Sequence, residues 1–104
     1  MEVNISNKHL LKLYETGKSN KYKLERRIIE NFFEVIAILE AAKDIHDLWS
    51  FPSLNFEKLK GFSKRYSVRL GRKYRLEMSI EWINEEMTIG IIDLEELSSH
   101  YGGG

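Results

Sequence analysis

Apolar and polar residues alternate through residues 66–82, and this pattern predicts two antiparallel strands. Apolar side chains occupy every second position both before and after Gly71. Strands that pair must turn their apolar sides to the same face of the sheet, which fixes the length of the turn between them. A three-residue turn, 71–73, meets this requirement by pairing Leu70 with Tyr74, Val68 with Leu76 and Tyr66 with Met78.

This register places Arg69 directly opposite Arg75. Like charges in that position destabilise a sheet. The pair therefore indicates an anion that binds between the two guanidinium groups. A structural alternative is an ion pair between Arg69 and its diagonal neighbour Glu77.

The same reasoning predicts a third strand after a turn at Asn84-Glu85. Apolar sides stay in phase if Trp82 pairs with Met87, Ile80 with Ile89 and Met78 with Ile91. Glu77 would then lie opposite Ile92 and Arg75 opposite Leu94, which places Ile92 and Leu94 on the polar face. The strand would end beside the basic turn, within reach of His100 and Tyr101.

The first half of the chain predicts one short strand and two helices. Val3 and Ile5 alternate with polar residues, and Ser6 or Asn7 can cap a helix that ends at Gly17. A second amphipathic helix is expected over about residues 22–43. Residues 44–65 lack a clean period, contain Pro52 and predict a loop pinned to the core by Trp49, Phe51, Leu54, Phe56 and Leu59.

The order β-α-α-β-β-β predicts a single α+β domain over residues 1–104. An antiparallel sheet would carry a helical hairpin on its apolar face. The other face would be polar and would carry both arginines.

Composition narrows the classes of protein. The chain has 42% apolar and 31% charged residues, no cysteine and no apolar run of the ~20 residues that a membrane-spanning helix needs. Its first residues lack the basic and apolar regions of a signal peptide, so a cytoplasmic location is expected. Three scattered histidines without cysteine argue against a metal site, and no cofactor is expected.

Charge is distributed unevenly although the net charge is zero. Residues 58–75 contain no acid, whereas residues 77–96 contain no lysine or arginine and seven acids. Any nucleic acid must therefore bind to a local basic patch. The candidates for that patch are Lys58, Lys60, Lys64, Arg65, Arg72 and Lys73.

The residues expected at the basic end of the sheet could cleave RNA without a metal. Arg69 and Arg75 would bind a phosphate and stabilise the charge that develops on it. His100 can transfer protons near neutral pH, and Tyr101 can stack on a base or transfer a proton. An exposed, functionless His–Tyr pair near the terminus is the structural alternative.

With this element order, the chain resembles toxins of the RelE/ParE superfamily, and most closely the HigB-like branch of plasmid maintenance killer proteins. Three segments carry the resemblance: L-N-F-E-K-L-K-G at 54–61, Y-S-V-R-L…Y-R-L-E-M at 66–78 and S-S-H-Y-G at 98–102. The resemblance implies a toxin inhibited by a cognate antitoxin, expected to be a helix-turn-helix protein. It also implies cleavage of mRNA in the ribosomal A site.

Carried over by position, Arg75 matches the family's arginine that contacts the scissile phosphate, and Arg69 falls near a basic position of the preceding strand. Tyr101, with His100, falls near the C-terminal aromatic or histidine that takes part in the reaction. Lys58 and Lys60 lie in the loop that contacts RNA in related toxins. The chain departs from the family in its neutrality, in Ser67 at a position where some relatives have lysine, and in its acidic run 93–96.

We therefore expect a ribosome-dependent mRNA endonuclease in which the RNA 2′-hydroxyl attacks the phosphorus. Two other functions stay open. A ParE-like toxin would poison DNA gyrase without catalysis, and zero net charge agrees with that function. An inactive relative would act only through partner binding.

Overall fold

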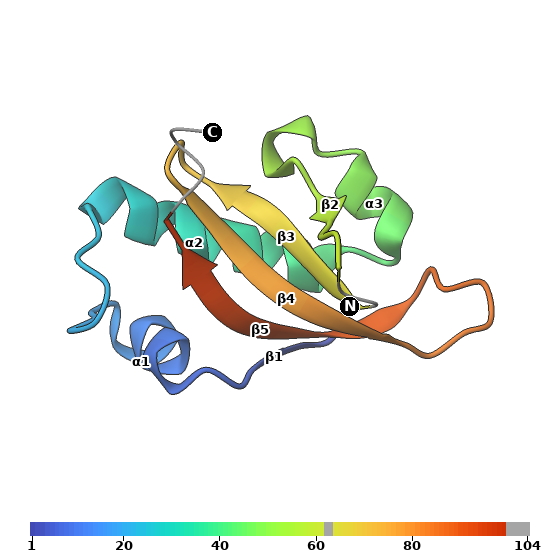
Figure 1. Cartoon of the computed structure of the whole chain (residues 1–104), viewed down its shortest axis with the longest axis horizontal. Helices are drawn as coiled ribbons and strands as arrows, with labels where there is room; N and C mark the ends of the chain where they lie inside the picture. The colour runs from blue at the N-terminus through green and yellow to red at the C-terminus, as the bar shows by residue number, and fades with distance from the viewer. Residues whose placement is uncertain (62–63, 100–104) are drawn as a thin grey trace.

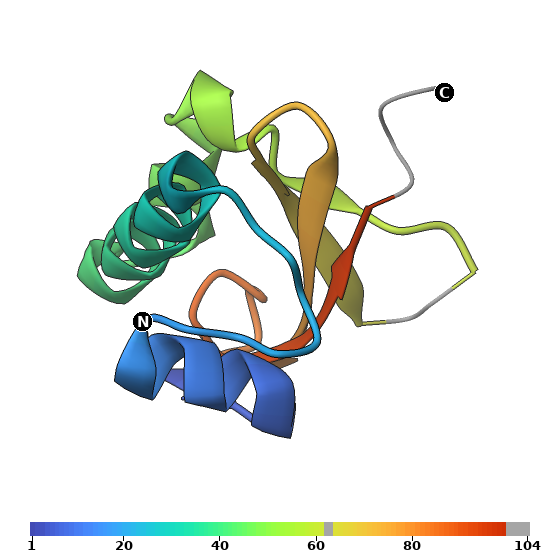
Figure 2. The same ribbon diagram turned by 90° about the vertical axis from the view of Figure 1, so that its left-hand side faces the viewer.

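The computed structural model describes residues 1–61 and 64–99. Its elements, in chain order, are β1 (Val3–Ile5), α1 (Lys8–Thr16), α2 (Arg26–Ala41), α3 (Ile45–Trp49), the 3₁₀ helix η1 (Pro52–Leu54), β2 (Glu57–Lys58), β3 (Arg65–Leu70), β4 (Tyr74–Trp82) and β5 (Gly90–Ser98). The strands form one sheet in the order β1-β5-β4-β3-β2. Figures 1 and 2 show α1 and α2 on the same side of this sheet. The α+β prediction is confirmed.

The sheet is mixed, so the expectation of a purely antiparallel sheet is wrong at one edge. β1 runs parallel to β5, with Val3 opposite Ile92 and Ile5 opposite Leu94. The connection from β1 to the rest of the sheet passes through helices, and a long connection does not impose the reversal that a tight turn does. At the other edge, the short β2 pairs antiparallel with β3.

The ends of α1 follow from two residues of the sequence. The side chain of Asn7 accepts hydrogen bonds from the backbone N–H groups of His9 and Leu10, at 2.8 and 3.1 Å. Gly17 ends the helix with a φ of +73°, and its N–H donates to the carbonyl of Leu13. Both caps agree with the sequence prediction.

The second helix is shorter than predicted, because the predicted helix began at Tyr22 and α2 begins at Arg26. Tyr22 and Leu24 instead belong to a non-helical link and pack partly buried against the core. Burial raises the pKa of the Tyr22 hydroxyl, although hydrogen bonds with Asn7 and the backbone of Leu97 oppose the shift. Tertiary packing thus overrides the helical period in this segment.

Residues 44–61 contain short elements where a loop was predicted. Pro52 opens η1, and Leu54 and Phe56 are buried, as expected of pinning residues. Phe56 stacks on Tyr66 of β3 with ring centroids 5.3 Å apart, and Trp49 packs edge-on against Phe56. This aromatic series fixes β2 beside β3. Trp49 and Phe51 themselves stay exposed.

The predicted β3–β4 register is confirmed at every pair, including Arg69 opposite Arg75. Gly71 in the turn has a φ of +67°, a conformation that favours glycine. The core lies between this sheet and the helices, and its largest fully buried side chains include Leu10, Phe32, Leu39, Leu76, Met78 and Ile92.

The predicted β4–β5 register is wrong. Trp82 pairs with Gly90, Ile80 with Ile92 and Met78 with Leu94. The side chain of Asn84 holds a longer turn by accepting from the N–H groups of Thr88 and Ile89, both at 3.0 Å. The register moves by three residues relative to the prediction, and an odd shift exchanges the two faces. Ile92 and Leu94 are therefore in the core and not on the polar face.

This register requires glycine at position 90, because no larger residue fits there. A Cβ at this position would lie 2.8 Å from the carbonyl oxygen of Glu81 and 2.5 Å from Cγ2 of Ile80. We expect Gly90→Ala to lower the free energy of unfolding by about 1–3 kcal/mol, measured by urea denaturation. Ser99→Ala, an exposed change just beyond β5, is the control. Equal stability of the two variants would contradict the close approach at Gly90.

Candidate active site on the uncovered face of the sheet

The face of the sheet opposite α1 and α2 is polar but not fully hydrated. Figure 2 shows that neither helix covers it. Ser67, Arg75 and Glu77 nevertheless are buried polar residues on β3 and β4. Because buried polar groups are stable only when they are hydrogen-bonded, their partners define what this face can do.

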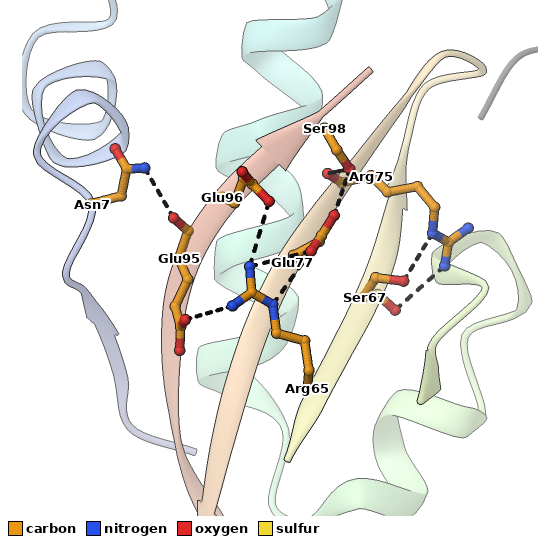
Figure 3. Close-up of polar contacts among 8 residues, drawn as sticks. All are labelled: Asn7, Arg65, Ser67, Arg75, Glu77, Glu95, Glu96 and Ser98. Carbon is orange, nitrogen blue, oxygen red and sulfur yellow. Dashed lines mark hydrogen bonds and ion pairs between the residues drawn. The ribbon is translucent and has the colours of Figure 1, made fainter. Parts of the chain in front are cut away.

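Arg75 lies across β3 and reaches the segment that leads into β2 (Figure 3). Its Nε donates to Oγ of Ser67 at 2.9 Å, and its Nη2 donates to the carbonyl of Asn55 at 2.7 Å. Asn55 has a φ of +45° at the end of η1, and its carbonyl faces the guanidinium group. Glu57 adds an ion pair at 3.4 Å. The protein itself thus supplies acceptors on one side of this guanidinium, where sequence reasoning placed an external anion.

Arg65 is surrounded by three carboxylates (Figure 3). Its Nη1 lies 2.8 Å from Glu95, and its Nη2 lies 3.2 Å from Glu77 and 3.5 Å from Glu96. We call this group the Arg65 cluster. It is partly buried, so water screens the charges less than on an open surface. The Glu77 ion pair that was considered for Arg69 is made by Arg65 instead.

A β-bulge in β5 builds the Arg65 cluster. Met78 pairs with Leu94, whereas the next pair joins Glu77 to Glu96, so Glu95 is the extra residue. A bulge turns two successive side chains toward one region of the face. Both Glu95 and Glu96 therefore reach the same guanidinium, and Leu97 returns to the core.

β5 ends beside Arg75. Ser98, its last residue, lies opposite Arg75 in the ladder and donates a 2.8 Å hydrogen bond from Oγ to Glu77. The prediction that Arg75 pairs with Leu94 is wrong. The expectation that this strand ends at the basic end of the sheet is confirmed. His100 and Tyr101 lie outside the described residues, two and three positions beyond Ser98.

The other candidate site residues are exposed cations, except Arg65, which is partly buried. Arg69 is exposed, although its Cα lies opposite that of the buried Arg75. Arg65 is already paired within its cluster, a structural role that competes with RNA binding. The exposed cations of the predicted RNA interface lie along β2, before β3 and in the β3–β4 turn: Lys58, Lys60, Lys64, Arg72 and Lys73.

Sequence reasoning missed Asn55, Glu57, Ser67 and the doubled acids 95–96 as partners of the two arginines. A bulge and a left-handed residue leave little trace in an alternating pattern. Within residues 1–61 and 64–99, no three His, Asp or Glu side chains are grouped so that they could hold a metal ion. None of the helices in these ranges has the length and apolar character needed to cross a membrane.

Comparison with known proteins identifies the relatives of this chain. Residues 3–94 match the family model described as the RelE-like toxin of the type II toxin–antitoxin system HigB. A solved structure, the YoeB/ParE toxin from Agrobacterium tumefaciens, superposes with a TM-score of 0.54 at 13% identity, covering 97% of this chain and 100% of that one. This likeness supports the fold alone. No curated protein matches the sequence.

The Arg65 cluster predicts a measurable stability difference. We expect Arg65→Met to lower the free energy of unfolding by about 1–3 kcal/mol, because the poorly hydrated carboxylate of Glu77 would lose its ion pair with Arg65. Arg26→Met is the control, since its pair with Glu30 is at 3.5 Å and Arg26 is 92% exposed. That change should cost less than ~0.5 kcal/mol. Equal losses in urea denaturation would contradict a structural role for the cluster.

Proposed function

Because the chain belongs to the HigB-like family of RelE-like toxins from type II toxin–antitoxin systems, we propose that it inhibits translation as a ribosome-dependent mRNA endonuclease. Membership of the family implies a cognate antitoxin as its partner. Cleavage, the ribosome as the site of action, and a helix-turn-helix antitoxin are part of the proposal. Such a toxin acts where ribosomes are, in the cytoplasm.

The observation that carries the proposal is the end of β5. Ser98 pairs with Arg75, so the chain continues toward His100 and Tyr101 from a position beside the backbone of Arg75, while the guanidinium itself lies across β3. The proposed reaction requires His100 or Tyr101 to reach a scissile phosphate bound at Arg75. In this mechanism the RNA 2′-hydroxyl attacks the phosphorus, and Arg75 and Arg69 stabilise the charge on the phosphorane. His100 or Tyr101 transfers the protons.

Glu57 must move for this reaction to occur. Its carboxylate lies 3.4 Å from Nη2 of Arg75, where a phosphate oxygen would bind. The side chain of Glu57 is 49% exposed, whereas that of Arg75 is 5% exposed, so the carboxylate can leave while the guanidinium keeps its bonds to Ser67 and Asn55. A phosphate would replace one anion with another and leave the cation paired.

The exposed cations supply the rest of the proposed RNA interface. Lys58 is the last residue of β2 and Lys60 follows it, and Lys64, Arg72 and Lys73 lie at the two ends of β3. Each would contact phosphate and contribute affinity without sequence information. Arg65 would contribute only if its carboxylates released it.

The test of function is induced expression with and without the adjacent antitoxin gene. We expect translation to stop within minutes, with mRNA cut inside codons only in translated regions when 5′ ends are mapped. Filamentation and DNA damage with intact mRNA would instead support a gyrase poison. Growth arrest with neither effect would support action through partner binding alone.

Substitutions at Arg75 and Glu57 test the site. Arg75→Lys keeps the charge but loses the planar group that contacts Ser67 and Asn55, so we expect cleavage to fall about 100-fold. Tyr101→Phe should also reduce cleavage if the hydroxyl transfers a proton. Glu57→Gln removes the competing carboxylate and should leave cleavage equal or higher.

Thermal unfolding must accompany these assays, because Arg75 is also structural. Arg75→Ala would remove the donor to the buried Ser67 hydroxyl and to the Asn55 carbonyl and cost about 1–3 kcal/mol, which makes it a poor probe of catalysis. Lys43→Gln, an exposed charge change at the far end of α2, is the control for toxicity. Full cleavage by both Arg75→Lys and Tyr101→Phe would overturn the assignment.

A further inference from the structure

A second basic site lies on the side of the turn that faces α2. Two adjoining hollows separate the first turns of α2 from the β3–β4 turn, and both are lined by Asn31, Glu34, Gly71 and Arg72. Arg69 and Ser53 complete one hollow, and Arg27 completes the other. We call the two together the arginine groove. Figures 1 and 2 show the start of α2 beside the β3–β4 turn.

The groove is preformed, because the turn is attached to the helix. The N–H of Gly71 donates to Oδ1 of Asn31 at 3.1 Å. Gly71 also sits so close to α2 that a Cβ would lie 2.5 Å from Cδ1 of Ile28. This bond uses the acceptor of the Asn31 amide, whose N–H groups have no acceptor among the described residues and can serve a ligand.

The charges of the groove favour an anion. None of its three arginines forms an ion pair with a residue in the described ranges. Arg27 also lies in the first turn of α2, where the helix dipole opposes a cation and favours an anion, and that turn contains no acid. Two acids, Glu30 and Glu34, line the groove and oppose an anion; Glu30 forms an exposed ion pair with Arg26 at 3.5 Å, and Glu34 forms no ion pair in the described ranges.

We propose that the arginine groove binds the phosphate backbone of RNA. This inference rests on the proposed function and extends the RNA interface from β2 and the β3–β4 turn onto α2. Arg27 of α2 and Arg72 of the β3–β4 turn suit the spaced phosphates of a strand better than a single small anion, since each can bind phosphate oxygens in a bidentate manner. Arg69, which also lines the groove, would join it to the proposed active site. Asn31 would add a neutral donor to phosphate or ribose.

Binding of a cleavage-resistant RNA tests the groove. The probe is a 20-nucleotide, 2′-O-methyl single-stranded RNA, which lacks the 2′-hydroxyl nucleophile and reports binding alone. We expect Arg27→Gln and Arg72→Gln each to raise Kd by about 3–10-fold and to reduce the slope of log K against log salt by about 0.7. The purified full chain is titrated by fluorescence anisotropy at several KCl concentrations.

Two further variants make the expectation specific. Glu34→Gln should lower Kd, by about 2–3-fold, because it removes the unpaired acid of the groove. Lys43→Gln removes one positive charge two residues beyond the opposite end of α2 and should leave Kd nearly unchanged. Circular dichroism checks that each variant is folded.

Several outcomes would overturn the inference. An equal rise in Kd for Lys43→Gln would show that Arg27→Gln and Arg72→Gln act only through the general charge of the protein. Complete competition by 1 mM inorganic phosphate or AMP would assign the groove to a small anion. Loss of antitoxin affinity with RNA affinity intact would assign it to a protein. If the variants weaken RNA binding while the wild type fails to cut mRNA in cells, the result supports RNA binding in the groove and contradicts the proposed nuclease activity.

Discussion

The pairing of β5 with β4 is the constraint on which the rest of this structure depends. At the start of β5, Gly90 allows the strand to lie close to Ile80 and Glu81 of β4. The register that follows turns Ile92 and Leu94 into the core. The bulge at Glu95 then shifts the second half by one residue. That shift delivers Ser98 to Arg75 and two carboxylates to Arg65. A change in this one ladder would therefore alter the core, the charge pairing and the position from which the chain continues toward His100.

The two arginines of the uncovered face solve the same physical problem in different ways. A guanidinium group that leaves bulk water needs acceptors, and removing them costs more than the pair contributes. Arg65 takes three carboxylates, which fixes it in place. Arg75 takes mainly neutral acceptors, Ser67 and the carbonyl of Asn55, with one half-exposed carboxylate. Ser67 and Asn55 thus hold Arg75 in position without repelling a phosphate, and its ion pair with Glu57 involves a half-exposed carboxylate that a phosphate could replace.

The sequence was sufficient to predict the elements that depend on local chemistry. Asn7 and Gly17 cap α1 as expected, and the β3–β4 register follows from alternation and one short turn. The β4–β5 register could not be obtained in this way. Ile91 and Ile92 are adjacent apolar residues, so either could face the core, and the choice depends on the side-chain bonds of Asn84 and on space at Gly90.

The candidate site shows the same division. Arg69 lies opposite Arg75 because of the β3–β4 register, so this pairing was predictable. The acceptors of Arg75 were not, because Asn55 reaches it through a left-handed backbone conformation at the end of η1 and Glu57 through a two-residue strand. Neither feature has a periodic pattern. The arginine groove was missed because it joins Asn31 of α2 to Gly71, 40 residues later, a contact that only the fold creates.

Neutrality of the whole chain does not prevent an anionic partner, because the charges are separated along the sheet. Three acids of the run 77–96 are used by Arg65, and Glu85 and Glu86 lie in the turn between β4 and β5. The basic turn 71–73 lies at the other end of β4, whose nine residues span ~30 Å at about 3.3 Å per residue. The screening length at physiological salt is about 8 Å, so the acids of the far turn contribute little field at the basic end. An approaching RNA would respond to the local excess of lysine and arginine around β2, β3 and the start of α2, and the sign of the total charge would be irrelevant to its binding.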